Sequence, residues 1–382
     1  MRVVIAPDSF KECASAVEVA DAIAAGVRRA LPDADLDLAP MADGGEGTVG
    51  VLVAATRGTG VTIEVTGPLG TPVSATYGIL GDGRTAIIEM SAASGLALVP
   101  NGRRDPRITA TRGTGDLIRD ALGRGIRRII VGIGGSATND GGAGMAQALG
   151  YALEDAAGNE LGPGGAALAR LERIDARRRD PLLDGSEVDV ACDVANPLCG
   201  PEGASRVYGP QKGASEPAVL ELDDALRHFA AIVRRDLGKD VLELPGAGAA
   251  GGLGAGLAAF AGGRLRPGVE LVAEVLQLAE RVKGAALVIT GEGALDGQTA
   301  HGKTPLGVAR IAKSEGVPVI ALAGTLGTDY RELYAAGIDA AFSICGQPMT
   351  FDEAIDRARE LLADTAEAVA RTWVAARRTG QD

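Results

Sequence analysis

The chain has 382 residues and a formal net charge of -12, with 46% hydrophobic and 23% charged residues. These values are typical of a soluble globular protein of one or two domains. The negative charge argues against nucleic acid as a partner, because binding to a phosphate backbone needs a basic face. Glycine, with 56 residues, has roughly twice its usual share, which indicates tight turns and close backbone approach to a ligand.

The cysteines and the apolar stretches bear on the cellular compartment. Four cysteines are scattered without a C-x-x-C pair, so we expect reduced thiols in a cytoplasmic protein. The N-terminal stretch lacks the apolar core of a signal peptide. The uncharged stretch 245–263 is rich in Gly and Ala and predicts a glycine-rich loop leading into a buried helix, with no membrane partner.

The beginning of the chain alternates short apolar strands with helices. RVVIA (2–6) predicts a strand, and a helical pattern follows from Ala16 to Leu31. A second strand is predicted at DLDLAP (35–40), and a second helix from about Gly47 to Thr56. This rhythm is typical of βαβ units and a parallel sheet.

The middle of the chain has a different texture. VTIEVTG (61–67), TPVSATYGIL (71–80) and RTAIIEM (84–90) predict an antiparallel group joined by glycine-containing turns. RRIIVGIGG (127–135), a helix from about Gly142 and VDVACDV (188–194) follow.

The βα rhythm returns late in the chain. Strands are predicted at 286–290, 317–324 and 340–344, with helices after Pro305, near Tyr330 and from about Asp352 to Arg378. The simplest organisation is one α/β domain built from both ends of the chain, residues 1–66 plus 271–382. A mixed α+β domain, residues 67–270, is inserted between them.

One segment matches a nucleotide-binding motif. GQTAHGKT (297–304) satisfies G-x-x-x-x-G-K-[ST], the phosphate-binding loop of many nucleotide hydrolases. The predicted strand ends at Thr290, and GEGALD separates it from the motif, whereas such a loop begins where its strand ends. A P-loop hydrolase therefore stays an alternative, and Thr304 is interpreted as incidental.

Two glycine fingerprints are weak signals. GAGAAG (246–251) and GIGGSA (132–137) match dinucleotide-binding patterns, but abundant glycine produces such matches by chance. The second follows a strand, yet SATNDGG intervenes before any helix, whereas a Rossmann turn runs directly into its helix. A nicotinamide-dependent enzyme is therefore disfavoured.

The rare lysines and several carboxylates suggest phosphate chemistry. Only six of the 38 basic residues are lysine, and Lys11, Lys212 and Lys303 lie in turn-forming stretches, where an ammonium suits a phosphoryl oxygen. Acidic residues follow strand-like runs, where ligands bind in open α/β sheets: Asp8, Asp43, Glu46, Asp193, Glu292 and Asp296. Such acids are also common as helix caps, but their recurrence beside Gly and Lys suits metal-bound polyphosphate.

Histidine gives little support for other chemistries. His228 lies in a helical pattern, and His301 stands beside Lys303 as a ligand-contact candidate. No His/Cys cluster supports zinc, so the chemistry tilts toward carboxylates, magnesium and lysine.

A set of motifs, in order along nearly the whole chain, closely resembles the bacterial glycerate kinase family of the type-1 class (glycerate 2-kinase). The motifs are PDSFK (7–11), MADGGEGT (41–48), TRGTG (111–115), GIGGSATNDGG (132–142), CDVANPLCGPEGA (192–204), YGPQKGA (208–214) and GEGALDGQTAHGK (291–303). The resemblance implies a flavodoxin-like (Rossmann-like) parallel-sheet domain carrying an inserted second domain, with the active site in the cleft between them. It also implies phosphorylation of D-glycerate by ATP with Mg²⁺, and favours the 2-hydroxyl over the 3-hydroxyl.

The predicted site residues follow from these motifs. Asp8 or Asp193 would deprotonate the glycerate hydroxyl, Lys11 and Lys303 would neutralise the transferring oxygens, and Glu292 or Asp296 would hold Mg²⁺ directly or through water. Arg112 or the ADGGEG turn would meet the substrate carboxylate, and the amides of GGSATNDGG would cradle an anion. The predicted binding residues are Ser9, Asp43, Gly44, Gly45, Glu46, Arg112, Gly134, Gly135, Ser136, Thr138, Asn139, Asp140, Asn196, Lys212, Gln298, Thr299 and His301.

Three alternatives stay open at this point. The chain could phosphorylate another small hydroxy acid, it could be a non-catalytic nucleotide- or metabolite-binding regulator on the same scaffold, or it could hydrolyse ATP without a co-substrate. A homodimer is also left open by the residues.

Overall fold

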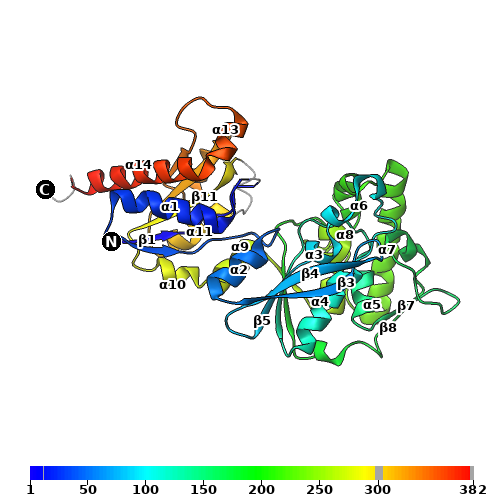
Figure 1. The fold of residues 1–382 in the computed structure, drawn as a ribbon. Coiled ribbons are helices and arrows are strands. Elements are labelled where there is room, and N and C mark those ends of the chain that lie inside the picture. The colour runs from blue at the N-terminus through cyan, green and yellow to red at the C-terminus, as the bar shows by residue number, and fades with distance from the viewer. Residues whose placement is uncertain (12, 297–303, 379–382) are drawn as a thin grey trace. The chain divides into compact units, whose positions relative to one another are not determined.

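The computed structural model describes residues 1–11, 13–296 and 304–378. The chain forms two compact units (Figure 1). Residues 1–43 and 269–382 form the first, called here the end unit, and residues 44–268 form the second, the middle unit. The mixed α/β fold is confirmed, and in this division the end unit contains both ends of the chain.

The end unit is built on a five-stranded parallel sheet. Its spatial order is β13-β12-β11-β1-β2. Numbered in chain order within this unit, the strands lie 2-1-3-4-5, the order of flavodoxin-like doubly wound sheets. The strands are β1 (Arg2–Ile5), β2 (Asp35–Leu38), β11 (Leu287–Leu295), β12 (Val319–Leu326) and β13 (Ala340–Ser343).

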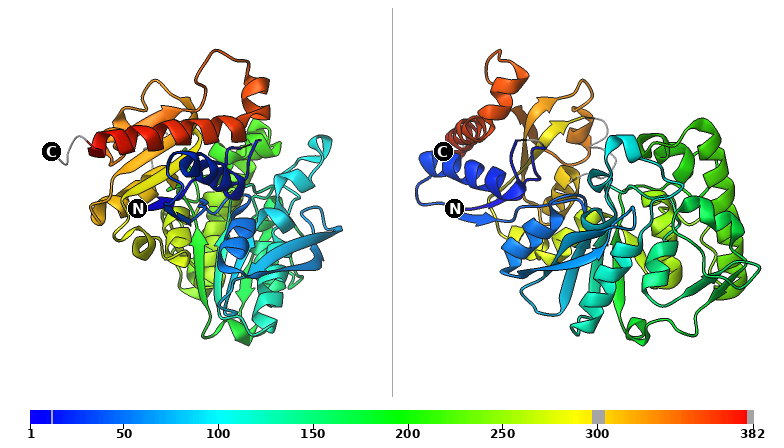
Figure 2. Two further views of the ribbon diagram at one scale, coloured as in Figure 1. Left: turned by 60° about the vertical axis from the view of Figure 1, so that its left-hand side comes forward. Right: turned by 45° about the vertical axis from the view of Figure 1, so that its right-hand side comes forward.

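Helices cover both faces of this sheet. α1 (Ala16–Ala30) and α14 (Ala358–Arg378) lie side by side (Figures 1 and 2) and share one apolar core with Val3, Ile5 and Ile289. Val4 and Val288 point to the opposite face and are fully buried as well. α11 (Thr304–Ser314) contacts β11 and β12. The unit's other helices are α9 (Gly268–Val275, which begins at the last residue of the middle unit), α10 (Leu278–Val282), α12 (Glu332–Ala335) and α13 (Phe351–Asp356).

The strand order places a switch point between β1 and β11. The chain leaves β1 toward β2 on one side and leaves β11 toward β12 on the other. In open α/β sheets, ligands bind outside the carboxyl ends of the strands at such a point. We therefore expect ligand-binding residues in the segments that follow β1 and β11.

β11 is longer than its sequence predicts. The predicted strand 286–290 is too short, because pairing with β12 continues through Gly291↔Leu322 to Leu295↔Leu326. Glycine is needed in this strand, since a Cβ at Gly291 would lie 2.2 Å from the carbonyl oxygen of Leu322. GEGAL is thus part of the sheet, although its glycines make the sequence look more like a loop than a strand.

The middle unit contains a six-stranded mixed sheet of order β10-β9-β6-β5-β4-β3. The antiparallel pairs β3/β4 and β4/β5 confirm the predicted antiparallel group. β5, β6, β9 and β10 run parallel, so their carboxyl ends share one edge. The strands are β3 (Thr59–Thr66), β4 (Pro72–Ile79), β5 (Thr85–Glu89), β6 (Arg128–Gly132), β9 (Glu187–Ala191) and β10 (Arg264–Arg266).

The first junction between units lies earlier in the chain than the expected position near residue 67. It falls between Asp43 and Gly44, because α2 (Thr48–Thr56) packs on the middle-unit strands β4 and β5. A Cβ at Gly78 on β4 would lie 2.4 Å from Val53 of this helix. The sequence does not indicate which of the two sheets a helix such as α2 packs on, because its apolar residues would suit either sheet. The second junction, at Gly268/Val269, lies close to the expected 270.

The middle unit has one large apolar core. α8 runs through the stretch 245–263, and the predicted buried helix is confirmed there, although Ala250, Gly251 and Gly252 adopt left-handed conformations that kink it. The helices are α3 (Ser91–Ser94), α4 (Arg112–Gly123), α5 (Ala143–Ala148), α6 (Ala204–Tyr208), α7 (Glu216–Leu237) and α8 (Ala249–Phe260).

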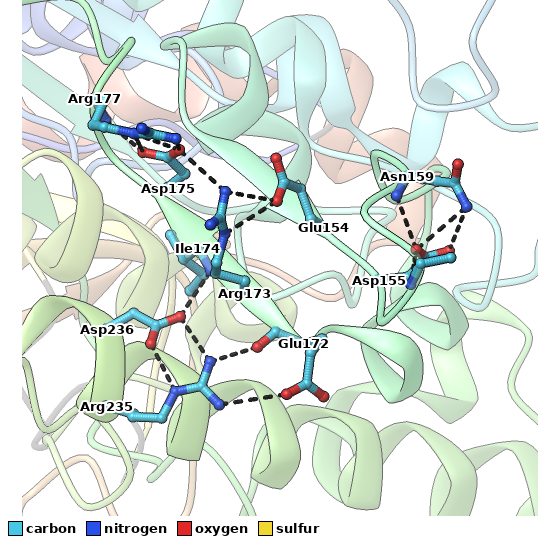
Figure 3. Close-up of polar contacts among 11 residues, drawn as sticks. Glu154, Asp155, Asn159, Glu172, Arg173, Ile174, Asp175, Arg177, Arg235 and Asp236 are labelled. Carbon is cyan, nitrogen blue, oxygen red and sulfur yellow. Dashed lines mark hydrogen bonds and ion pairs between the residues drawn. The ribbon is translucent and has the colours of Figure 1, made fainter.

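A small hairpin is tied to α7 by polar contacts (Figure 3). It consists of β7 (Ala152–Glu154) and β8 (Arg173–Asp175). Asp236 of α7 accepts a hydrogen bond from the Ile174 amide at 2.8 Å, and Arg173 pairs with Glu154 at 3.0 Å. Exposed ion pairs of this kind each contribute little to stability, so this cluster serves the fold of the hairpin.

Two further predictions concern helices. The predicted helix 352–378 divides at Arg357 into α13 and α14, and a capping box formed by Thr350 and Glu353 begins α13. Within the described residues, no helix is long and apolar enough to cross a membrane.

Candidate active site

Asp8 lies at the switch point of the end-unit sheet, three residues after β1. Its backbone N–H donates to the carbonyl oxygen of Gly291 on β11 at 2.8 Å, which anchors the segment to the neighbouring strand. Its carboxylate Oδ1 accepts a hydrogen bond from the Ser9 N–H at 2.6 Å, and Oδ2 accepts one from the Thr304 hydroxyl at 2.6 Å. The sheet and α11 therefore hold both oxygens of one carboxylate.

The surroundings of Asp8 change its acidity. Burial raises the pKa of Asp8 to about 6, the Thr304 hydrogen bond opposes that rise, and the negative charge of Asp43 adds to it. A carboxylate with a pKa near the working pH is suited to accept a proton during a reaction. Asp8 is therefore the strongest candidate base of the end unit.

Other predicted residues gather at the same edge. Asp43 follows β2. Lys11 is exposed, and its backbone lies beside β11, where a Cβ at Gly293 would lie 3.7 Å from the Lys11 backbone nitrogen. Glu292 is buried in β11, and Asp296 follows that strand directly. The end unit thus brings together several of the predicted carboxylates with Lys11.

Four predicted site residues lie outside the described residues: Gln298, Thr299, His301 and Lys303. What can be described are the flanks of their segment. β11 ends at Leu295 and α11 begins at Thr304.

These flanks correct one step of the sequence argument. The motif GQTAHGKT was set aside partly because its strand was expected to end at Thr290, but β11 ends only two residues before Gly297. Thr304 is also not incidental, since it is fully buried and donates to Asp8. A strand therefore ends shortly before the motif and a helix begins at its last residue, as the flanks of a phosphate-binding motif require, and other observations must decide the family.

The middle unit provides a second group of loops, which is dominated by glycine. A Cβ at Gly132, the end of β6, would lie 2.1 Å from the Gly44 oxygen, and a Cβ at Gly44 would lie 2.3 Å from Ala191, the end of β9. A Cβ at Gly134 would lie 3.3 Å from Gly45. The predicted residues Gly44, Gly45 and Gly134 thus meet at the carboxyl edge of this sheet, where only glycine allows so close a backbone approach.

The segment after β6 is fixed by hydrogen bonds to its neighbours. The Leu96 N–H donates to the Gly135 oxygen at 2.8 Å, and the Thr109 hydroxyl donates to the Ala137 oxygen at 2.7 Å. Two polar atoms of this segment, Thr138 Oγ1 and Asn139 Oδ1, are buried without a hydrogen-bond partner among the described residues. Buried atoms of this kind require an explanation such as water or a ligand.

Asp140, which is predicted to contact a ligand, is a buried anchor in the structure. Its Oδ2 accepts from the Thr111 N–H and hydroxyl, both at 2.9 Å, and from the Gly144 N–H at 3.2 Å. Oδ1 accepts from the Gly142 N–H at 3.1 Å. Burial raises the pKa of Asp140, and these donors oppose the rise. With 1% exposure, Asp140 joins the start of α4 to the start of α5.

Lys212 is also buried, with 1% exposure. Its Nζ donates to the Thr138 carbonyl oxygen at 2.7 Å, so the lysine supports the segment that carries the two unpartnered atoms. Burial lowers the pKa of Lys212 to about 7, and the negative charge of Asp140 opposes this shift. The ammonium is thus costly to keep charged in this position.

We expect this cost to make the stability depend on pH. The unfolded chain holds the lysine proton up to about 10.5 and the folded chain only up to about 7, so the unfolded chain binds more protons between these values. The free energy of unfolding of the wild type should therefore rise with pH across this window relative to Lys212→Met. Urea titrations at several pH values measure this, and a difference that does not change with pH would contradict it.

The remaining predicted residues of the middle unit lie in exposed or intermediate positions. Asp193, after β9, is exposed, and its Oδ1 accepts from the Gly268 N–H at 2.8 Å. Asn196 accepts from the Tyr208 hydroxyl at 2.7 Å. Ser136 is buried next to the exposed glycines 134 and 135, and Glu46 is exposed.

Arg112 is the first residue of α4 and lines a cavity of about 820 Å³ between α4 and β3. Three arginines line this cavity together with three acidic residues, Glu64, Asp116 and Asp120. The charges of these side chains balance, so the cavity does not favour an anion. The expectation that Arg112 meets a substrate carboxylate gains no support from this cavity.

Two residues with roles at the site were missed from the sequence. Thr304 could have been found because it occupies the final Ser/Thr position of the phosphate-loop motif, at which a helix begins. Glu89, the last residue of β5, accepts from the Val49 N–H at 2.7 Å and so caps the start of α2 beside Glu46. Burial raises the pKa of Glu89, and the α2 amides oppose this. The sequence pattern that could have identified Glu89 is the one used for the other acidic residues, a carboxylate at the end of a predicted strand.

The acidic residues of the end unit suit magnesium better than zinc or calcium. Within the described ranges, no three His, Cys, Asp or Glu side chains are grouped closely enough to hold a metal alone. Magnesium needs only one or two carboxylates and takes its other ligands from phosphate and water. Glu292 in β11 and Asp296 directly after it are two such carboxylates of the end unit. The donor set therefore fits Mg²⁺ brought together with a phosphate group.

The fold and the loops together define a class. A flavodoxin-type sheet with carboxylates and a lysine at its switch point, joined to a unit with glycine-rich loops, is an α/β enzyme for small charged metabolites. The family model described as the glycerate kinase family matches residues 3–374. The chain belongs to the glycerate kinase family.

Individual relatives agree with this assignment. The chain is 54% identical over 373 residues to a glycerate kinase of Halalkalibacterium halodurans, covering 97% of this chain and 98% of the relative. It is 53% identical over 372 residues to the glycerate 2-kinase of Escherichia coli, with 97% and 98% covered. It is also similar to a crystal structure described as glycerate kinase 2 of Salmonella typhimurium, with a TM-score of 0.91, 53% identity and 99% of both chains covered.

Proposed function

We propose that this chain transfers the γ-phosphoryl group of ATP to D-glycerate, with Mg²⁺, and that the 2-hydroxyl is the acceptor. Family membership over nearly the whole chain and the name of the Escherichia coli relative support the reaction and its position. The observation that carries the chemistry is Asp8, held by two donors at the switch point with its pKa raised to about 6.

The end unit would supply the proton acceptor and the charges. Asp8 takes the proton of the glycerate hydroxyl, while Lys11 and Lys303 neutralise the oxygens of the transferring group. Glu292 or Asp296 would hold Mg²⁺, directly or through water, and the bound ion would reduce the negative charge of the phosphates. Asp8 is preferred over Asp193 as the base because burial tunes its pKa toward neutrality.

The middle unit would supply anion binding. The backbone of 134–142 is fixed on several sides, and the unpartnered Thr138 and Asn139 atoms give it polar groups for a ligand or for ordered water. Backbone amides in such a loop bind anions without a net basic surface, in keeping with the charge of -12. A homodimer and a cytoplasmic location stay predictions from the sequence.

A phosphorus NMR spectrum of the product tests this proposal. With D-glycerate, ATP and Mg²⁺, we expect one new phosphomonoester whose coupling to a single methine proton marks the 2-position. Coupling to a methylene pair would instead identify the 3-hydroxyl as acceptor. No new ester from glycerate, but one from another hydroxy acid, would favour the alternative substrate, and ATP binding without any ester would favour a non-catalytic regulator.

A further inference from the structure

Thr304 joins the start of α11 to the carboxylate of Asp8. It is fully buried, and its hydroxyl donates to Asp8 Oδ2 at 2.6 Å across 296 positions of sequence. A hydrogen bond this short from a hydroxyl to a carboxylate is of the strong, charge-assisted kind. The contact links the segment after β1 to a helix that packs on β11 and β12.

The geometry leaves Asp8 little freedom. The Ser9 N–H donates to Oδ1 at 2.6 Å, while the Asp8 N–H donates to Gly291 at 2.8 Å. Among the described residues, the donors to the Asp8 side chain are Ser9, within the same segment, and the Thr304 hydroxyl, from outside it. Without it, Oδ2 would lose the contact that sets the rotation of the carboxylate.

Threonine is well suited to this task. Its β-branched side chain restricts χ1, so the hydroxyl direction is limited once the helix backbone is set. The donated proton also favours the ionised form of Asp8 against burial and the nearby charge of Asp43. A hydroxyl therefore orients the carboxylate and keeps it able to accept a proton.

We propose that Thr304 is a positioning residue for phosphoryl transfer, which holds the Asp8 carboxylate in the orientation that accepts the proton of the substrate hydroxyl. In that step the glycerate oxygen forms its bond to the γ-phosphorus as the bond from that phosphorus to the ADP oxygen breaks. The electron pair leaves with ADP, and the hydroxyl proton moves to Asp8. The inference rests on the proposed function and deepens it.

Three variants test the inference. Thr304→Val keeps the shape and removes the hydroxyl, Thr304→Ser keeps the hydroxyl, and Thr290→Val serves as a matched control. Thr290 is also a fully buried threonine of the same unit, but its hydroxyl donates at 2.8 Å to a backbone oxygen, that of Ala6. Both valine variants lose one buried hydrogen bond, but only Thr304→Val loses a contact to the base.

We expect Thr304→Val to lower kcat roughly 10- to 100-fold, with the KM for ATP and glycerate changed no more than about threefold. Thr304→Ser should restore most of the lost kcat, and Thr290→Val should keep kcat near the wild type even if its Tm falls. Initial rates of ADP release together with thermal melts measure these quantities. If Thr304→Val does not fold, Thr304→Ala against Thr304→Ser gives the same comparison.

Three outcomes would overturn the inference: wild-type kcat in Thr304→Val, no rescue by Thr304→Ser, or an equal loss of kcat in Thr290→Val. Failure of the proposed function looks different, because the wild type itself would then release no ADP in response to glycerate.

Discussion

Replacing Asp8 with asparagine should lower kcat for glycerate phosphorylation by roughly a hundred- to ten-thousand-fold, the usual contribution of a general base. Asparagine has nearly the same shape, and its one side-chain oxygen can still accept from the Ser9 N–H, while its NH₂ group can donate to the Thr304 hydroxyl oxygen in place of the present contact. The fold should therefore persist, with a Tm close to that of the wild type. Steady-state kinetics beside circular dichroism and thermal melts measure the two effects separately.

Asp339 offers a matched control carboxylate in the same unit. It accepts from Lys313 at 2.6 Å and from the Val319 N–H at 2.7 Å, at the amino ends of β12 and β13 and so at the opposite edge of the sheet. Asp339→Asn should keep kcat near the wild-type value. If Asp8→Asn kept it too, Asp8 would not be the base, and Asp193 would become the candidate.

The second large effect is expected on stability. Asp140→Ala should lower the free energy of unfolding by about 3 to 4 kcal/mol, because it leaves buried donors of Thr111, Gly142 and Gly144 without an acceptor. The loss should also reduce activity, since this carboxylate fixes the end of the 134–142 segment. Urea unfolding monitored by circular dichroism measures the change.

Asp155 serves as the control for this variant. It accepts from the amides of Ala157 and Asn159, both at 2.9 Å, but in an exposed turn of the hairpin region (Figure 3). Because water can replace these contacts, Asp155→Ala should cost no more than about 1 kcal/mol. Equal losses in the two variants would contradict the anchoring role of Asp140. An Asp140→Ala protein that is stable but binds ligand weakly would instead support the ligand contact that the sequence predicts.

Much of the fold could be predicted because the local pattern is strong. Strands such as RVVIA are short apolar runs bounded by turn formers, and the antiparallel group shows alternation and glycine turns. The failures have physical causes. The strand was predicted to end at Thr290, before GEGAL. Glycine is unfavourable in strands, yet the close approach of β11 to Leu322 requires it here. The sequence likewise does not show which sheet α2 covers.

The candidate site was less predictable than the fold. Strand-end acids could be found from their place after apolar runs, but the sequence does not separate a buried anchor from an exposed group. Asp140 and Asp193 each lie in a segment that follows a strand of the middle unit, although one accepts four hydrogen bonds in the core and the other is exposed. The contact between Asp8 and Thr304 joins residues from opposite ends of the chain, so only the sheet order reveals it.

The most direct test of the proposed function is the initial rate of ADP release by the wild-type protein with ATP and Mg²⁺, compared among D-glycerate, L-glycerate, glycerol, related hydroxy acids and no acceptor. The proposed kinase reaction predicts rapid release with D-glycerate and only background release without an acceptor. ADP release that is equally fast without any acceptor would instead identify an ATP hydrolase and contradict the proposal. The absence of a glycerate-dependent signal would contradict it as well.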